Sequence, residues 1–337
     1  MKSWLKHSFI LAVTSSLILS GCGNSAKTDN SGAESDPGSK KIKIAATFYP
    51  MAEFSRQVAG EHAEVITLVP AGVEPHDWEP SPKDMTVIKE ADVFVYNGGV
   101  EGWVDKALES AANDKRIVVE TIHDLELIEG EEHSHEGEEA GHEDEHAHEG
   151  EEAGHADEDV HEHGLDPHVW LSPVLAQKQV AAIQAALEKA DPAHKEDYKK
   201  NADIYIAKLK ELDELFKSGL NGAKRKDFVT QHAAFAYLAK EYGLTQVPIS
   251  GISPEQEPSP SQMAEVIKFA KEHDVKTIFF ETLVDPKIAQ TIAKEVGAKT
   301  DVLNPIEGLT EEDQKENLDY IGVMKKNLEA LKKALNE

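Results

Sequence analysis

Short apolar runs alternate with longer amphipathic stretches along most of the chain, and this alternation constrains the fold more than any other feature. Four strands are expected before residue 125, at 41–46, 64–69, 92–96 and 116–120. Four more are expected after residue 225, at 227–231, 245–248, 277–281 and 299–303. Amphipathic helices are expected between them, for example at 51–59, 82–91, 263–273 and 287–296. Such alternation is typical of mainly parallel sheets with helices on both faces, so it predicts an α/β fold with two four-stranded lobes.

A long helical region separates the two groups of strands. Residues 173–190 read as one helix, which Asp191-Pro192 ends. The next helix, at 193–220, would be roughly 40 Å long at 1.5 Å per residue. We therefore expect an N-terminal lobe at 41–192, one long rigid linking helix, and a C-terminal lobe at 221–337. A stiff helical link predicts a small closure around a ligand and not a wide hinge motion.

The N-terminus predicts export. A short cationic head precedes an apolar run at 9–19, which is far shorter than the roughly 20 residues needed to span a bilayer. Small residues then precede Cys22, the only cysteine of the chain, as in a bacterial lipobox. Residues 1–21 are thus a predicted signal peptide and 22–40 a flexible tether with a lipid on Cys22. The alternative is an ordinary signal peptide with a chance cysteine, but both interpretations place the protein outside the cytoplasm.

Residues 129–163 form an insert of unusual composition. They contain 16 acidic residues and no Lys or Arg, and so account for 16 of the 28 net negative charges of the chain. Eight of the 16 histidines also lie here: His133, His135, His142, His146, His148, His155, His161 and His163. We expect the insert to be disordered without metal and to attract zinc, copper or nickel, although no single histidine in it is assigned as a ligand. The alternative is a solvated linker. Because no basic stripe exists elsewhere, nucleic acid is excluded as a partner.

Four residues outside the insert form a candidate metal site. His76 follows the second predicted strand, His232 follows the fifth, and Glu281 ends the seventh. His168 precedes a helix that starts at Ser172-Pro173. Open α/β sheets build their ligand sites at the carboxyl ends of parallel strands. Two candidates come from each half of the chain, so the site is expected in the cleft between the lobes.

The residue types of this site indicate zinc. Three imidazoles and one carboxylate form a tetrahedral shell with bonds of about 2.0–2.2 Å, while manganese prefers more oxygen ligands. Asp166 or Asp77 would accept a ring N–H and fix a tautomer. Each residue taken alone has a simpler explanation: His232, for example, could cap a helix. The prediction depends on all four occurring together in an exported protein with a histidine-rich insert.

Several segments resemble the cluster A-I solute-binding lipoproteins of bacterial ABC importers, which take up zinc or manganese. They are Thr47-Phe48-Tyr49-Pro50, Val73-Glu74-Pro75-His76-Asp77-Trp78, Asp166-Pro167-His168-Val169-Trp170, His232-Ala233-Ala234-Phe235 and Gly251-Ile252-Ser253-Pro254. The resemblance covers residues 41–336. It implies two α/β lobes bridged by a rigid helix, metal in the interlobe cleft, and His76 and His168 as the first two ligands.

The resemblance also favours the zinc branch of that family. Manganese-type members typically have a carboxylate at the third ligand position, where this chain has His232, and Asp at the fourth, where it has Glu281. The resemblance also implies that some zinc-type members use water or another nearby carboxylate in the fourth position, which leaves water or Glu74 as alternatives to Glu281. The resemblance implies a monomeric, lipid-anchored protein that carries Zn²⁺ as transported ligand to an ABC permease and its ATPase.

Two other classes of function, a zinc enzyme and a surface adhesin, are alternatives to transport. An enzyme could use three histidines to hold a zinc that activates water, but catalytic zinc keeps an open position, which Glu281 would fill. Outside the insert no His-Glu-x-x-His motif is present, and the one match, His142-Glu143-Asp144-Glu145-His146, lies within the insert of acidic and histidine repeats, so we expect no enzymatic activity. A surface adhesin is compatible with a lipid anchor, although no sequence feature requires it.

Overall fold

The computed structural model describes residues 41–130 and 164–337. The predicted signal peptide, Cys22, the tether and the eight histidines of the insert therefore lie outside the described residues. Within the described ranges, no helix combines the length and the apolar character that crossing a membrane requires.

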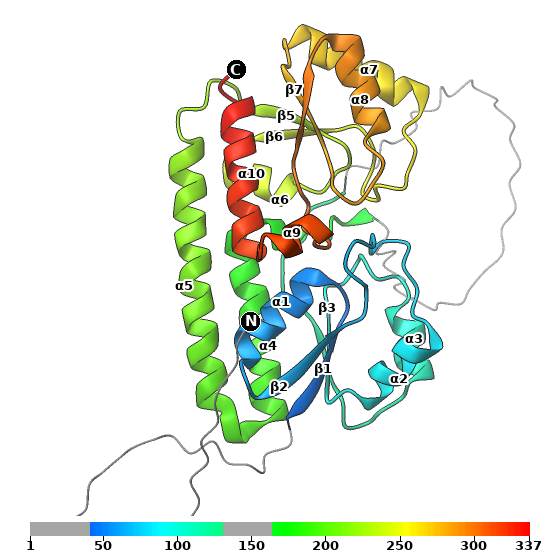
Figure 1. The fold of residues 1–337 in the computed structure, drawn as a ribbon, viewed down its shortest axis with the longest axis vertical. Helices are drawn as coiled ribbons and strands as arrows, with labels where there is room; N and C mark the ends of the chain where they lie inside the picture. The colour runs from blue at the N-terminus through cyan, green and yellow to red at the C-terminus, as the bar shows by residue number, and fades with distance from the viewer. Residues whose placement is uncertain (1–40, 131–163) are drawn as a thin grey trace, which may run out of the picture. The chain divides into compact units, whose positions relative to one another are not determined.

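The first sheet has four parallel strands in the order β2-β1-β3-β4 (Figure 1). The strands are β1 (Ile42–Ala46), β2 (Ala63–Thr67), β3 (Val93–Tyr96) and β4 (Ile117–Glu120). The helices of this lobe are α1 (Tyr49–Ala59), α2 (Pro82–Glu90) and α3 (Val104–Ser110). Each strand lies within a residue of the predicted start and two of the predicted end.

The second sheet repeats this topology, with four parallel strands in the order β6-β5-β7-β8. The strands are β5 (Asp227–Thr230), β6 (Thr245–Pro248), β7 (Thr277–Phe280) and β8 (Lys299–Val302). The helices are α6 (Ala236–Glu241), α7 (Pro260–Glu272), α8 (Lys287–Val296), α9 (Glu311–Lys315) and α10 (Tyr320–Ala334). The predicted α/β fold with two four-stranded parallel sheets is confirmed.

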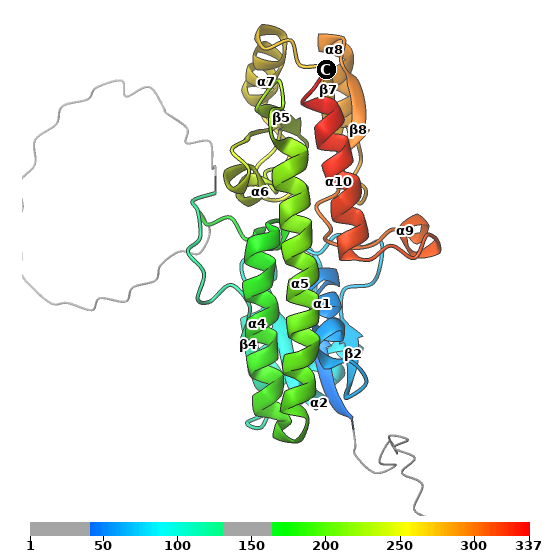
Figure 2. The same cartoon turned by 90° about the vertical axis from the view of Figure 1, so that its left-hand side faces the viewer.

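Two long helices connect the sheets. The helix α4 (Pro173–Ala190) leads through the short 3₁₀ turn η3 (Pro192–His194) into α5 (Lys195–Leu220). At 26 residues α5 is about 39 Å long. Figure 2 shows it running beside α4 and then beside α10, so that it follows both lobes. The helix is continuous, which confirms the predicted linking helix.

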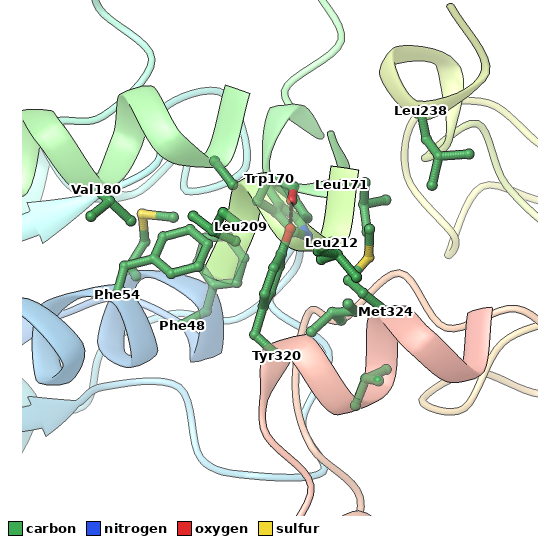
Figure 3. Packing of buried hydrophobic residues seen from close by; sticks show 14 of the residues in the cluster. Phe48, Phe54, Trp170, Leu171, Val180, Leu209, Leu212, Leu238, Tyr320 and Met324 are labelled. Carbon is green, nitrogen blue, oxygen red and sulfur yellow. Dashed lines mark hydrogen bonds between the residues drawn. The ribbon is translucent and has the colours of Figure 1, made fainter. Parts of the chain in front are cut away.

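One hydrophobic core extends through both lobes. Alternate residues of a strand face opposite sides of a sheet, so Ile44 and Ala46 of β1 pack under α1, α4 and α5, while Ala45 packs under α2 and α3. In the second sheet, Phe279 joins the same core as Ile44, whereas Ile278 packs under α7 and α8. Figure 3 shows the part of this core where α1, α4, α5 and α10 meet. Because the lobes share buried apolar surface along α5, a wide separation would expose it to water.

Three helices begin at a Ser-Pro pair, which ends the loop that precedes the helix. Ser81, Ser172 and Ser259 are the N-caps of α2, α4 and α7, and each side chain accepts a hydrogen bond from a backbone N–H in the first turn. The proline that follows has the φ angle of a first helical residue and lacks the N–H that would be unsatisfied there. The loops before α2 and α4 therefore end at fixed positions, and these two loops carry His76 and His168.

Candidate metal centre

His76 lies in the loop between β2 and α2. Both carboxylate oxygens of Glu74 accept a hydrogen bond from the His76 backbone N–H, at 3.1 Å each. Beyond it, the Trp78 ring packs edge-on against Trp103 at 5.3 Å between centroids, which ties the loop to the core of the first lobe. The His76 side chain is 7% exposed, more than the other three groups of the site.

His168 is buried at the start of the 3₁₀ turn η2 (Val169–Leu171). One oxygen of Asp166, Oδ1, accepts two hydrogen bonds from this residue, one from the backbone N–H at 2.9 Å and one from ring Nδ1 at 2.7 Å. Because the carboxylate acts as the acceptor, Nδ1 carries a proton, and Nε2 is the nitrogen that a metal ion can bind in place of a second proton. The prediction that Asp166 fixes the tautomer of a ligand histidine agrees with this geometry, whereas Asp77 is exposed.

His232 follows β5 and is held by a carboxylate in the same way. The Glu281 Oε1 atom accepts a hydrogen bond from the His232 backbone N–H at 3.0 Å and another from ring Nδ1 at 2.6 Å. The pairing follows from the topology, because β5 and β7 are neighbours and Glu281 comes directly after β7. This arrangement again makes Nε2 the nitrogen of the ring that faces away from the orienting carboxylate.

Glu307 lies in the loop after β8 and is buried. The residue before it, Ile306, has φ of 61°, a left-handed conformation that is an outlier for a β-branched side chain. Its backbone N–H is held at 2.7 Å by Asn304 Oδ1. Trp170 Nε1 also donates to the Pro305 carbonyl, at 2.8 Å. These contacts hold the turn that points Glu307 toward the histidines, and one of them comes from the 3₁₀ turn next to His168.

The Nε2 atoms of the three histidines converge on Glu307. The distances from Glu307 Oε1 are 3.3 Å to His76 Nε2, 3.5 Å to His168 Nε2 and 3.6 Å to His232 Nε2. The Nε2 atoms of His168 and His232 are 3.4 Å apart. The four ligand atoms all lie within 4.8 Å of one another. Two of these residues come from loops of the first lobe and two from loops of the second.

The structure differs from the sequence prediction at the carboxylate. It brings His76, His168 and His232 together, but the acidic member of the group is Glu307 and not Glu281 or Glu74. The reason is geometric, since Glu281 directly follows its strand and is already paired with His232 Nδ1, on the far side of the ring from Nε2. Glu307 was not selected from the sequence, although it also follows the carboxyl end of a parallel strand. The same rule applied to β8 would have found it.

Charge in the site is balanced between carboxylates and imidazoles. Burial opposes ionisation of Glu307, but hydrogen bonds from the three histidines outweigh it and hold the pKa of this carboxyl well below its usual range. Burial likewise disfavours the charged form of His232, but Glu281 and Glu307 outweigh it and raise its pKa to about 10. The pKa of His168 is also raised, since Asp166 and Glu307 outweigh its burial. The buried carboxylates thus stabilise positive charge among the histidines, which is carried by protons when no metal is bound.

Comparison with known proteins agrees with this chemistry. The family model described as zinc-uptake complex component A, periplasmic, matches residues 44–334. The chain is 48% identical over 320 residues to the high-affinity zinc uptake system protein ZnuA of Bacillus subtilis, covering 95% of this chain and 94% of that protein. It is 44% identical over 336 residues to the zinc-binding lipoprotein AdcA of Streptococcus pneumoniae, covering 98% of this chain and 61% of that longer protein.

A solved structure is similar over the same region. It is the crystal structure of the Zn(II)-bound ZnuA-like domain of Streptococcus pneumoniae AdcA, with 43% sequence identity and a TM-score of 0.71. The match covers 88% of this chain and all of that domain.

Proposed function

The chain belongs to the zinc-uptake complex component A family, and from this premise we propose that it captures Zn²⁺ outside the cytoplasmic membrane and delivers it to the permease of an ABC importer. We propose His76, His168, His232 and Glu307 as the ligands of the ion. Glu281 and Asp166 then serve as the carboxylates that orient two of the rings.

The spacing of the ligand atoms is the observation that carries this proposal. Vertices that lie 2.0–2.2 Å from the centre of a tetrahedron are about 3.3–3.6 Å apart, and 2.0–2.2 Å is the bond length of zinc to nitrogen and oxygen. The four contacts around Glu307 Oε1 and between His168 and His232 span 3.3–3.6 Å. Four of the six edges of the tetrahedron thus already have the length of a zinc site, and all four ligand atoms lie within 4.8 Å of one another, so binding of zinc needs only a small inward movement of the side chains.

The donor set favours zinc over harder ions. Three imidazole nitrogens and one carboxylate oxygen suit zinc, whereas manganese and magnesium prefer shells rich in oxygen. Each orienting carboxylate, Asp166 at His168 and Glu281 at His232, also raises the basicity of the Nε2 atom that faces the ion. Zinc replaces the protons that otherwise balance the charge of the buried acids.

The division of the ligands between lobes supports a simple mechanism for delivery. His76 and His168 belong to the first lobe, and His232 and Glu307 belong to the second, so a small relative movement stretches the shell. The core shared along α5 limits that movement to a small amplitude. Docking on the permease would shift one lobe, weaken its two bonds to the ion and release it for ATP-driven import.

The family is a solute-binding component of transport, and we further propose that this chain has no catalytic activity. Glu307 occupies the fourth position that a catalytic zinc would keep for water or substrate. We also propose the monomeric state, the lipid anchor at Cys22, and the division into lobes at 41–192 and 221–337 with a linking helix at 193–220. The insert at 129–163 would raise the local concentration of zinc.

Metal analysis and a binding titration test the proposal. The purified protein, titrated with zinc against a competing chelator, is expected to hold one tightly bound ion, and His168→Ala should abolish that tight site. His123→Ala is a matched control because the His123 side chain is 76% exposed and lies outside the site. A variant lacking residues 131–163 should keep the tight ion, and a strain lacking the gene should grow poorly when zinc is scarce. Retention of tight zinc by His168→Ala would overturn the assignment.

A further inference from the structure

A two-stranded stem lies next to His168, formed by residues 128–130 and 164–166. Glu129 and Leu165 form an antiparallel bridge. The Asp166 N–H donates to the Ile128 carbonyl at 3.0 Å, and the Gly130 N–H donates to the Gly164 carbonyl at 2.6 Å. The second strand of the stem ends at Asp166, whose carboxylate orients His168. The position of this stem therefore affects the orientation of a ligand of the ion.

A single hydroxyl from the second lobe holds both strands of the stem. Tyr237 lies on α6 and is 4% exposed. Its hydroxyl donates to the Asp166 carbonyl at 2.7 Å and accepts from the Ile128 N–H at 3.1 Å. Both partners are backbone groups, so the hydroxyl fixes the course of the chain and not a side-chain rotamer.

The next carbonyl along the chain is held from the first lobe. Asn97 Nδ2 donates to the Pro167 carbonyl at 2.9 Å, and Gln179 Nε2 donates to Asn97 Oδ1 at 2.9 Å. The two residues before His168 are thus fixed from opposite lobes, one through Tyr237 and the other through Asn97. A relative shift of the two lobes therefore moves these two hydrogen-bond donors apart or together and changes the position of the Asp166 backbone.

We propose that the Tyr237 hydroxyl is a positioning group for zinc binding, which couples the second lobe to His168 through the stem and the Asp166 carboxylate. The inference rests on the proposed zinc-binding function and deepens it. The ring has a separate role, because it packs with Ile122 and Val169 in a small apolar cluster. Loss of the hydroxyl alone should leave that packing in place while Asp166 becomes less firmly held.

Tyr237→Phe in the full chain tests the proposal. We expect the rate of zinc release to a competing chelator to rise, and the affinity to fall, by about tenfold, at the low end of what loss of an outer-shell partner costs. Tyr242→Phe is the matched control, since the Tyr242 hydroxyl donates to Asp213 on α5 at 3.2 Å and does not touch the stem. The control should release zinc at the wild-type rate.

A double-mutant cycle separates positioning from simple stabilisation. If Tyr237 acts through Asp166, Tyr237→Phe should change the release rate less than about twofold in an Asp166→Ala background, because the oxygen that orients His168 is then absent and coupled residues are not additive. A full tenfold effect in that background would overturn the proposal. So would a wild-type release rate in Tyr237→Phe accompanied only by a lower melting temperature. Failure of the wild-type protein to bind zinc would instead reject the proposed function, so the two failures are distinguishable.

Discussion

Exchange of one carboxylate at a time distinguishes the ligand from the orienting group. Glu307→Gln and Glu281→Gln remove the same charge and keep nearly the same volume, and both residues are buried. Only Glu307 lies within 3.6 Å of all three Nε2 atoms. Glu281 contacts the opposite nitrogen of one ring, His232 Nδ1, at 2.6 Å. We therefore expect the two substitutions to weaken zinc binding to different extents.

The expected loss of zinc affinity differs because Glu307 is a proposed ligand, whereas Glu281 orients a ligand. Structural zinc sites with four protein ligands bind with about 10–16 kcal/mol, or about 2.5–4 kcal/mol per ligand. Since about 1.4 kcal/mol corresponds to tenfold in affinity, loss of the Glu307 carboxylate should raise the dissociation constant by about 10²–10³-fold. Loss of an orienting carboxylate typically costs about 10–100-fold. In Glu281→Gln the new amide oxygen can still accept the bond from His232, so the low end of that range, about tenfold, is expected.

The assay is a zinc titration in competition with a chelator, at one equivalent of zinc or less, so that the tightest site is measured. Melting of the metal-free variants serves as a control for folding. A larger loss of affinity for Glu281→Gln than for Glu307→Gln would refute the reasoning, because it would assign the fourth bond to the residue that the structure places behind His232.

Three further predictions concern the scaffold. Trp170→Phe should destabilise the metal-free protein by about 1–3 kcal/mol in denaturant unfolding, and also weaken zinc binding, because a buried carbonyl next to Glu307 loses its donor. Leu209→Ala should cost about 2–5 kcal/mol because Leu209 is fully buried in the core shared by both lobes, and calorimetry should still show one transition. Burial raises the pKa of Asp191, but hydrogen bonds from His194 Nδ1 at 2.6 Å and from the Tyr198 hydroxyl at 2.8 Å outweigh it and lower the pKa. The resulting stabilisation is present above the pKa of unfolded Asp, about 3.9, and is lost as pH falls through the lower folded value, so Asp191→Asn should be less stable than wild type at pH 7 and equal to it in strong acid.

Most of the fold could be predicted from the sequence because its strands and helices are marked by local patterns of apolar and turn residues. Strands such as β3 and β7 are short apolar runs, and α5 keeps one buried face through residues such as Tyr205, Leu209 and Phe216. His76 and His232 could be found because the carboxyl ends of parallel strands meet at one edge of a sheet, whereas His168 could be identified from its place before the helix that starts at Ser172-Pro173. The His76 and His168 loops also end at Ser-Pro caps that are visible in the sequence.

The choice between the two glutamates depends on information that is not local. Glu307 reaches the histidines because Ile306 adopts a left-handed conformation, which the residue type disfavours. That conformation is maintained by contacts from distant parts of the chain, including Trp170. The role of the Tyr237 hydroxyl is equally non-local, since its partners lie 71 and 109 residues away. Hydrophobic periodicity and short sequence motifs describe local structure, so they do not predict such long-range contacts.

A crystal structure of the zinc-loaded protein, with anomalous scattering measured at the zinc edge, tests the central claim most directly. We expect one strong peak about 2.0–2.2 Å from the Nε2 atoms of His76, His168 and His232 and from a carboxylate oxygen of Glu307. Glu281 and Asp166 should remain hydrogen-bonded to the Nδ1 atoms behind their rings. A peak away from the three histidines, or one bonded to Glu281 in place of Glu307, would contradict the account.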